Sequence, residues 1–306
     1  MTCRVVILLA SFEGAAFLRE QLASIAAQGH ADWQLIWRDD GSGDDSAAIL
    51  RAFAAAQAPG RVEELAVPAG RVGSAASFQA LLRHAAPTLG ADDVVAFADQ
   101  DDVWLPFKLE RAVAALGSGD PAIYSARQIL VDARLRRLGV SDLVVPPMGF
   151  PASLTQNLAI GCTVALNQAA ARLVAGSEAP AGCQHDWWAY LLVTAAGGML
   201  IADAEPVVWY RQHARNAVGA PRTFLRRGLA AVQRGPGAFM RLLRGNVAAL
   251  DAQRALLTPH ACAELDEIRA ALDGGRLRRL RVLRMKGLRR QSWSEQLVFW
   301  AWFVIR

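Results

Sequence analysis

The sequence predicts an α/β fold in which helices flank a mixed sheet and a helical appendage follows at the C-terminus. Over the first 125 residues, short apolar runs alternate with helical patterns, which is typical of parallel strands joined by helices. Between residues 120 and 166, strand-like runs follow one another around a Pro/Gly-rich loop, so the sheet is expected to become mixed. After about residue 221 only helical periodicity remains.

Four strand and helix pairs are expected in the first part. Each strand is an apolar run, and each helix repeats its apolar residues every three or four positions. Pro106 suits the first turn of the fourth helix, where the missing N–H has no intrahelical partner. The pairs are Arg4 to Ala10 with Ala15 to Gln28, Trp33 to Trp37 with Ser46 to Gln57, Val62 to Val67 with Ser74 to Ala86, and Val94 to Ala98 with Pro106 to Leu116.

The next part predicts more strands than helices. Its two helices are expected at Gln168 to Ala175 and at His185 to Ala196, where the helical pattern resumes. The strands are expected at Ala122 to Arg127, Gln128 to Asp132, Leu158 to Leu166, Met199 to Ala202 and Val207 to Arg211.

Composition indicates a globular chain that works in a reducing compartment. Of the 306 residues, 53% are hydrophobic and 20% are charged, which excludes a disordered protein. The four cysteines show neither a C-x-x-C pair nor metal-ligand spacing, which favours the cytoplasm. The apolar run Val5 to Ala10 is too short for a secretory signal, and no run reaches the roughly 18 residues of a membrane span.

The charge is divided unevenly along the chain. Residues 1–221 hold 16 Lys/Arg and 22 Asp/Glu, a net −6, whereas residues 222–306 hold 17 and 6, a net +11. The two segments are therefore expected to have different roles: a catalytic domain over 1–221 and a basic helical region over 222–306.

Three carboxylates, Asp99, Asp101 and Asp102, directly follow the apolar run Val94 to Ala98. Carboxylates crowded at the end of a buried strand repel one another unless a cation or hydrogen-bond donors compensate them. Mg²⁺ or Mn²⁺ takes oxygen ligands from one or two carboxylates and from substrate phosphates, so a metal site is one interpretation. An acidic turn that caps the next helix is the other.

A second acidic group, Asp39 and Asp40, follows the strand expected at Trp33 to Trp37. A carboxylate at such a position can accept hydrogen bonds from a ribose hydroxyl or a base N–H. The alternative is an Asx turn, with Asp44 or Asp45 capping the following helix.

Two further groups carry potential chemistry. Asp186 stands beside Trp187 and Trp188, and a carboxylate held against aromatic surface suits a general base, although it also suits the N-terminus of a helix. His213 is a potential metal ligand, and Arg211 or Arg215 could neutralise phosphate.

Taken in order, these residues resemble the family 2 glycosyltransferases of the GT-A fold. The resemblance covers about residues 3–219 and is closest to the bacterial branch that includes rhamnosyltransferases of surface-polysaccharide assembly. Its most specific parts are the strings Asp-Gln-Asp-Asp-Val-Trp and His-Asp-Trp-Trp. The residues that carry it are Leu9 to Gly14, Phe17 to Leu22, Ser24, Ile25, Arg38 to Ser42, Gly73, Ser77, Phe78, Phe97 to Trp104, Lys108, Leu109, Gly161 to Thr163, His185 to Trp188 and Tyr210 to His213.

The resemblance implies a Rossmann-like GT-A sheet and a role for each matching residue. Asp99 and Asp101 match the D-x-D motif, in which Asp101 holds Mg²⁺ or Mn²⁺ against the donor diphosphate and His213 completes the metal shell. Asp186 matches the catalytic base. The donor pocket would include Ser11, Glu13, Asp39 and Arg71, and the acceptor site Cys162, Trp187 and Trp188.

The implied reaction moves a sugar from a nucleotide diphosphate to a glycan or lipid-linked glycan, with inversion at the sugar C1. L-rhamnose from dTDP-L-rhamnose is the expected donor sugar. Glu13 and Arg71 depart from residues that are common in relatives, which leaves a UDP-hexose or UDP-N-acetylhexosamine open. A catalytically silent nucleotide-sugar-binding protein is the alternative from a different class.

The segment Arg276 to Arg306 mixes basic side chains with Trp and Phe. This pattern favours a helix that lies on an anionic membrane, at the inner face of the cytoplasmic membrane. A contact between copies of the chain is the alternative, and nucleic acid is disfavoured because the catalytic segment is acidic. A chain ending near Gly274 is then expected to stay soluble and to keep nucleotide binding.

Overall fold

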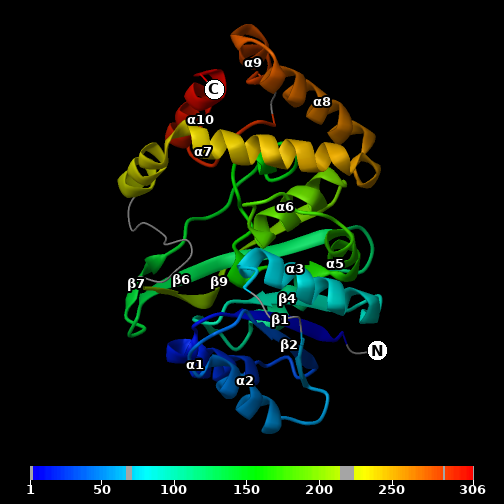
Figure 1. Cartoon of the computed structure of the whole chain (residues 1–306), viewed down its shortest axis with the longest axis vertical. Helices are drawn as coiled ribbons and strands as arrows, with labels where there is room; N and C mark the ends of the chain where they lie inside the picture. The colour runs from blue at the N-terminus through cyan, green and yellow to red at the C-terminus, as the bar shows by residue number, and fades with distance from the viewer. Residues whose placement is uncertain (1–2, 67–70, 214–223, 285–286, 306) are drawn as a thin grey trace.

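The computed structural model describes residues 3–66, 71–213, 224–284 and 287–305, with the backbone alone for 224–235. Within these residues, a nine-stranded sheet forms the centre and helices cover both of its faces (Figure 1). The strand order is β3-β2-β1-β4-β8-β6-β9-β5, and β7 pairs with β6 outside this path. Both parallel and antiparallel pairs occur, which confirms the predicted α/β fold with a mixed sheet.

The parallel half of the sheet brings the ends of its strands to one edge. It contains β1 (Val5–Ser11), β2 (Trp33–Asp39), β3 (Val62–Glu64) and β4 (Val94–Ala98). Ser11 pairs with Asp39, and Leu9 pairs with Ala98, so the loops after β1, β2 and β4 begin side by side. Ligands of open α/β sheets bind at this edge. The connecting helices are α1 (Ala15–Ala26), α2 (Ser46–Ala55) and α3 (Ser74–Ala85).

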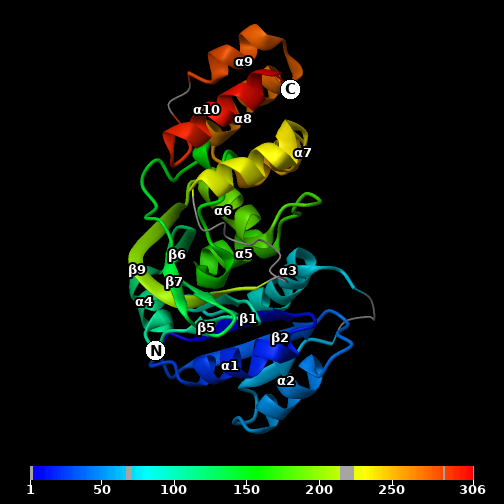
Figure 2. The same ribbon diagram turned by 90° about the vertical axis from the view of Figure 1, so that its left-hand side faces the viewer.

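Alternating side chains along β1 divide the core into two clusters. Val6 and Leu8 point toward α3, α5 (Gln168–Ala175) and α6 (His185–Ala195). Ile7 and Leu9 point toward α1, α2 and α4 (Lys108–Ala115) on the other face. Figure 2 shows α1 and α2 on one side of the sheet and α5 and α6 on the other. Burial on both faces explains why β4 is apolar throughout and β1 is apolar up to Ser11.

The mixed half contains two long strands where the sequence predicted four short ones. β6 runs from Ala122 to Asp132, and β9 from Met199 to Gln212. The two strands pair in parallel. The register is irregular around Arg127, but the pairing continues on both sides of that residue. Two short strands were not predicted, β5 (Val103–Trp104) on β9 and β7 (Arg137–Val140) on β6.

Three local predictions were wrong. The expected strand from Leu158 is only β8 (Ala165–Asn167), because a 3-10 turn (Gly161–Thr163) precedes it. In that turn the N–H groups of Ile160 and Gly161 donate to the side chains of Ser125 and Asp186 instead of to a neighbouring strand. The helix expected from Pro106 begins only at Lys108, so Pro106 precedes α4. The strand expected over Val62 to Val67 ends at Glu64, and Val67 itself lies outside the described residues.

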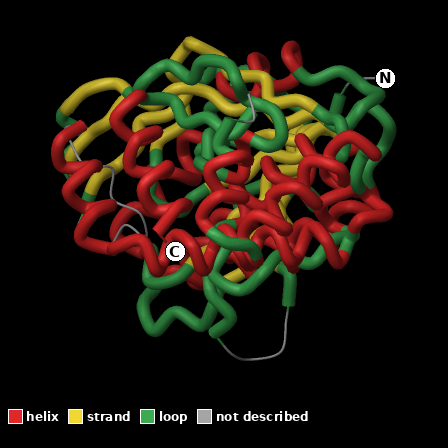
Figure 3. The backbone as a smooth tube through the Cα atoms, turned by 90° about the horizontal axis from the view of Figure 1, so that it is seen from above, coloured by secondary structure: helices red, strands yellow, loops and turns green. Residues whose placement is uncertain are grey.

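Among the described residues, four C-terminal helices form a layer beyond α6 (Figure 1). They are α7 (Phe224–Ala252), α8 (Pro259–Asp273), α9 (Arg276–Val282) and α10 (Trp293–Ile305). In the view from above, helices lie around the C-terminus in front of the strands (Figure 3). Leu250, Leu265 and Phe303 belong to the same buried cluster as Trp188 of α6, so this helical region packs directly on the sheet domain. No helix within the described residues combines the length and the apolar character needed to cross a membrane.

Candidate active site

The loop after β4 carries the acidic group, and His213 at the end of β9 meets it. The Nε2 atom of His213 lies 2.8 Å from Oδ2 of Asp101, and the His213 ring stacks on Phe17 with the centroids 4.8 Å apart. Asp102 is fully buried, and its Oδ1 accepts a hydrogen bond of 3.1 Å from the backbone N–H of Arg211. Residues more than a hundred positions apart thus form one polar cluster.

The acidic loop concentrates negative charge. Burial, together with the charges of Asp101 and Asp186, raises the pKa of Asp99 to about 7. Burial also raises the pKa of Asp102 well above its ordinary value, and Asp101 and Asp99 add to the effect. A divalent cation bound in this loop would lower the pKa of these carboxyl groups and so favour their ionised forms. The charge pattern therefore matches a site that receives a cation.

Two sets of side chains could hold that cation. Ligand atoms of Asp99, Asp102 and Cys162 lie within 4.8 Å of one another. Burial raises the pKa of the Cys162 thiol well above its usual value, and a protonated thiol is a poor ligand for Mg²⁺ or Mn²⁺. Asp101 and His213 offer an oxygen and a nitrogen, and their side chains keep 16% and 13% of their exposure. The Asp101–His213 pair fits a divalent cation that also binds a substrate phosphate.

Lys108, one of the residues that carry the family resemblance, is buried in this site, a role that was not predicted from the sequence. Its Nζ donates to the carbonyl of Cys162 at 2.7 Å and lies 3.2 Å from the centre of the Trp104 ring. Burial lowers the pKa of Lys108 to about 7, although Cys162, Asp102 and Asp99 oppose this. Lys108 is at the first position of a short amphipathic helix, where a lysine is ordinarily solvated, so nothing in the local pattern indicated its burial.

Asp186 lies at the start of α6 beside the acidic loop. Its Oδ2 accepts a hydrogen bond of 2.9 Å from Gly161 N–H, and its Oδ1 accepts one of 2.6 Å from Trp187 N–H. Its charge is close enough to raise the pKa of Asp99. Asp99, Asp101, His213 and Asp186 are therefore brought together around one edge of the sheet.

The three residues expected at the acceptor site differ in exposure. Trp187 is partly exposed, and its indole donates to the carbonyl of Ser153 at 2.8 Å. Trp188 is 1% exposed, and its indole donates to Ser177 in the core. Cys162 is also 1% exposed and accepts from the Gln128 amide. Of the three side chains, only that of Trp187 can reach a ligand without rearrangement; the acceptor assignment stays a prediction.

Gly161 offers a test of how Asp186 is positioned. A Cβ atom at residue 161 would stand 3.2 Å from Oδ2 of Asp186. We expect Gly161→Ala to shift the carboxylate by a few tenths of an ångström and to lower kcat several-fold, because small displacements of catalytic groups are costly. Steady-state kinetics of this variant beside Gly275→Ala, whose Cβ meets open space, would check it. Equal kcat values would contradict a positioned base.

The loops after β1 and β2 are tied to each other and to Gln100. The Gln100 amide accepts from Ser11 Oγ at 3.1 Å and from Phe12 N–H at 2.8 Å, a contact that the sequence analysis missed. Glu13 adopts a positive φ of 52° and accepts from Gly43 N–H at 2.7 Å. Asp39 accepts from the N–H groups of Gly41 and Ser42, which is the Asx turn left open as an alternative.

The loop before α3, which contains Arg71, is held at the same edge of the sheet by a buried ion pair. Arg38 and Asp40 are 2% and 4% exposed, and Arg38 Nη1 lies 2.7 Å from Asp40 Oδ1. Asp40 also accepts from Val72 N–H at 2.8 Å and from Gly73 N–H at 2.7 Å. This holds Arg71 at the rim, where its guanidinium lies 3.8 Å from the centre of the Phe12 ring.

Arg211 has a structural role instead of the expected contact with phosphate. Its side chain is 1% exposed, and its guanidinium donates to the carbonyls of Asp101 and Ala133 and to Glu20. Because the side chain of Arg211 is almost fully buried, its guanidinium is not accessible to a ligand. Arg211 therefore supports the loop that carries Asp101 from the side of the core. Arg215, the other residue considered for phosphate, lies outside the described residues.

A known protein family matches the part of the chain that carries the acidic loop of this site. Residues 6–172, more than half of the chain, match the family described as glycosyl transferase family 2. The chain belongs to that family. The match includes the loops after β1, β2 and β4, and therefore the acidic group of the site. The resemblance predicted from the sequence is confirmed, and the protein is a glycosyltransferase.

Curated relatives of this glycosyltransferase include one with a described activity. The chain is 26% identical over 222 residues to the dTDP-rhamnosyl transferase RfbG of Shigella flexneri, a match that spans 71% of this chain and 75% of the relative. It is 32% identical over 117 residues to an uncharacterized glycosyltransferase of Nostoc, covering 38% and 34% of the two chains.

Solved structures share the fold of this glycosyltransferase. The mannosyltransferase PcManGT of Pyrobaculum calidifontis, solved with GDP-Man and Mn²⁺, superposes with a TM-score of 0.52 at 18% identity. The alignment covers 98% of this chain and 87% of that one. TarS of S. aureus in complex with UDP-GlcNAc gives 0.53 at 12% identity over 81% of this chain and 66% of that chain. The predicted GT-A architecture is confirmed.

Proposed function

We propose that this glycosyltransferase transfers L-rhamnose from dTDP-L-rhamnose to a hydroxyl of a glycan or lipid-linked glycan, with inversion at C1. The contact between Asp101 and His213, with Asp186 close to the same loop, carries the proposal, because it combines a candidate cation site with a candidate base. The similarity to a dTDP-rhamnosyl transferase over 71% of the chain supports the choice of donor.

In the proposed reaction the protein aligns the two substrates and accepts a proton. The acceptor oxygen forms a bond to C1 as the bond from C1 to the diphosphate oxygen breaks, so the configuration at C1 is inverted in one displacement. Asp186 takes the proton of the attacking hydroxyl, and the N–H groups of Gly161 and Trp187 hold its carboxylate in place. Glu13, Asp39 and Arg71 are proposed to line the side from which the nucleotide enters, and Ser11, which is 1% exposed, supports their loops through its hydrogen bond to Gln100.

A divalent cation is proposed at Asp101 and His213. When bound, Mg²⁺ or Mn²⁺ would offset the negative charge that develops on the departing nucleoside diphosphate. Arg211 supports this site through two contacts. Its guanidinium donates to the Asp101 carbonyl, which fixes the acidic loop. It also lies 4.5 Å from the centre of the Phe17 ring, on which His213 stacks. The Mn²⁺ in the structure of PcManGT supports the same interpretation.

We expect Asp101→Asn to weaken Mn²⁺-dependent binding of dTDP by about 10-fold or more, because the amide removes the charge that a cation requires but keeps the shape. Calorimetry with dTDP in the presence and absence of Mn²⁺ measures this. Asp120→Asn, an exposed carboxylate away from the site, is the matched control. An unchanged affinity in the Asp101 variant would remove the metal assignment.

A donor screen tests the sugar. Hydrolysis of dTDP-L-rhamnose, UDP-N-acetylglucosamine and GDP-mannose is compared with Mn²⁺ present. We expect the first to be turned over fastest. Preference for a UDP sugar would replace the rhamnosyl assignment, and binding of all donors without any turnover would favour a silent nucleotide-sugar-binding protein.

The basic region 222–306 is proposed to place the enzyme on an anionic membrane, where a lipid-linked acceptor would be found. The net charge of +11 over these residues supports this, since each basic side chain near an anionic surface adds to the attraction. Residues 1–221 would then transfer the sugar, and residues 222–306 would attach the enzyme to the membrane. Side chains of both segments pack in one core cluster.

A further inference from the structure

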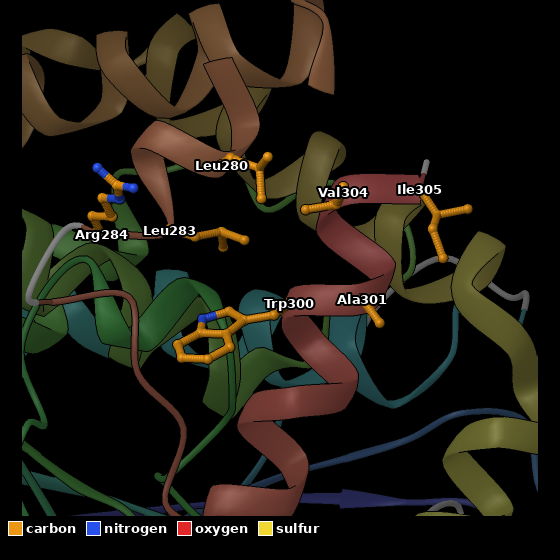
Figure 4. A pocket seen from close by; sticks show the side chains of 7 residues that line it. All are labelled: Leu280, Leu283, Arg284, Trp300, Ala301, Val304 and Ile305. Carbon is orange, nitrogen blue, oxygen red and sulfur yellow. The ribbon is translucent and has the colours of Figure 1, made fainter. Parts of the chain in front are cut away.

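The C-terminal helices carry an open apolar groove on the outside of the molecule. It encloses about 420 Å³ between α9 and α10. Leu280 and Leu283 line it from the end of α9, and Trp300, Val304 and Ile305 line it from α10 (Figure 4). Arg284 stands at its edge. The rim is thus charged while the floor is apolar.

The two faces of α10 have different surroundings. Gln296, Phe299 and Phe303 point inward, and the two phenylalanines belong to the protein core. Leu297 and Ile305 remain 48% and 64% exposed on the outward side. The inner face already has its packing partners, so a chain that ends near Gly274 would lose core side chains. The expectation that such a chain stays soluble is not supported.

Exposed arginines occur on α9 and just after it, and one of them, Arg284, lines the groove. Arg276, Arg278, Arg281 and Arg284 are exposed, and none forms an ion pair or a side-chain hydrogen bond with another described residue. Arg279 differs, because its guanidinium donates to the carbonyls of Ala271, Leu272 and Phe303 and so fastens α9 to its neighbours. No acidic residue occurs between Gly274 and Ser294.

We propose that the α9–α10 groove and these four arginines form the surface that binds an anionic phospholipid bilayer, with acyl chains against the groove and lipid phosphates on the guanidinium groups. The combination of an apolar floor and a purely basic rim complements such a bilayer in both respects. A second copy of the chain would bring like charges together. Nucleic acid would match the arginines but would leave exposed leucines such as Leu277, 84% exposed, without a partner.

This proposal rests on the membrane attachment proposed above and names the surface that performs it. It is independent of the sugar-transfer chemistry, since vesicle binding needs neither donor nor acceptor. The variants below lie outside the catalytic site. They are expected to hydrolyse the donor at the wild-type rate, so a failure of vesicle binding and a failure of catalysis are distinguishable.

The test is co-sedimentation of the full chain with vesicles of equal parts phosphatidylcholine and phosphatidylglycerol at low salt. Each arginine is expected to contribute about fivefold to the affinity, so R281Q/R284Q should weaken binding about 25-fold. R134Q/R137Q, which removes two exposed arginines of the β6–β7 hairpin, is the matched control and should bind like wild type. Vesicles of phosphatidylcholine alone should bind far less of every variant.

The apolar floor is tested separately. Leu280→Ser is expected to weaken binding about fivefold, because a half-exposed leucine loses its contact with acyl chains. Leu143→Ser, at 55% exposure elsewhere, is the control, and urea unfolding checks that both variants fold. Equal binding by the two arginine double variants would overturn the proposal. The proposal would also be overturned if the wild type formed concentration-dependent dimers and Leu280→Ser did not, because the groove would then be a contact between two copies of the chain.

Discussion

Replacing Asp186 by asparagine is expected to lower turnover by about 100-fold or more and to leave donor affinity nearly unchanged. The amide cannot take a proton from the acceptor hydroxyl at neutral pH. It has almost the shape of the carboxylate, and its oxygen can still accept one of the two hydrogen bonds from Gly161 and Trp187. Steady-state kinetics and calorimetry with dTDP would measure the two effects separately.

Two controls make the result specific to the proton transfer. Thermal unfolding of Asp186→Asn should change little, because only one backbone hydrogen bond is lost. Asp120→Asn removes an exposed carboxylate elsewhere and should keep full turnover. Wild-type turnover in the Asp186 variant would show that another group is the base. A parallel loss of donor affinity and turnover would indicate a structural or binding role for Asp186.

The Arg38→Met variant is expected to lose about 3–5 kcal/mol of unfolding free energy, the usual effect of leaving one partner of a buried ion pair alone. Asp40 would remain nearly inaccessible to water without its counter-charge. Urea unfolding followed by circular dichroism measures the loss. The exposed pair of Arg51 and Glu64 is the matched comparison, and Arg51→Met should change stability by at most about 1 kcal/mol.

The loss caused by Arg38→Met should depend on pH. Burial by itself raises the pKa of Asp40, but hydrogen bonds from Val72, Arg38 and Gly73 outweigh it and hold the pKa below its usual value. The stability that this carboxylate contributes is therefore complete above the unfolded pKa of about 3.9 and is lost as the pH falls through the folded value. The difference between wild type and variant should narrow below about pH 4. A constant difference would contradict the ion-pair explanation.

Most strands and helices around the site were predictable because they are long or continuously apolar. β1 and β4 are almost entirely apolar and are buried on both faces, so their composition alone indicates this burial. The run from Leu158 was equally apolar but forms a turn, because Ser125 and Asp186 supply acceptors for its N–H groups. Those acceptors come from other elements, so the local pattern could not distinguish the turn from a strand.

The acidic part of the site was predictable for a geometric reason. Carboxyl ends of parallel strands lie at one edge, so Asp39 and Asp99 had to lie near each other once the strands were recognised. The supporting residues were not predictable. Gln100, Lys108 and Arg211 lie in segments that carry the family resemblance, but their structural roles depend on contacts with residues far away in the chain.

The sequence by itself determined the order of the elements, the family and the acidic edge of the sheet, because these depend on residue types at short spacings. Only the tertiary structure decided which charged groups are buried and which aromatic residues face outward. Arg211 enters the core because Glu20, Asp101 and Ala133 accept its hydrogen bonds, and Phe303 faces inward because Phe299 and the core cluster pack against it. The free energy of burying a polar or aromatic side chain depends on the partners that the fold brings to it, and those partners are set by the packing of distant segments.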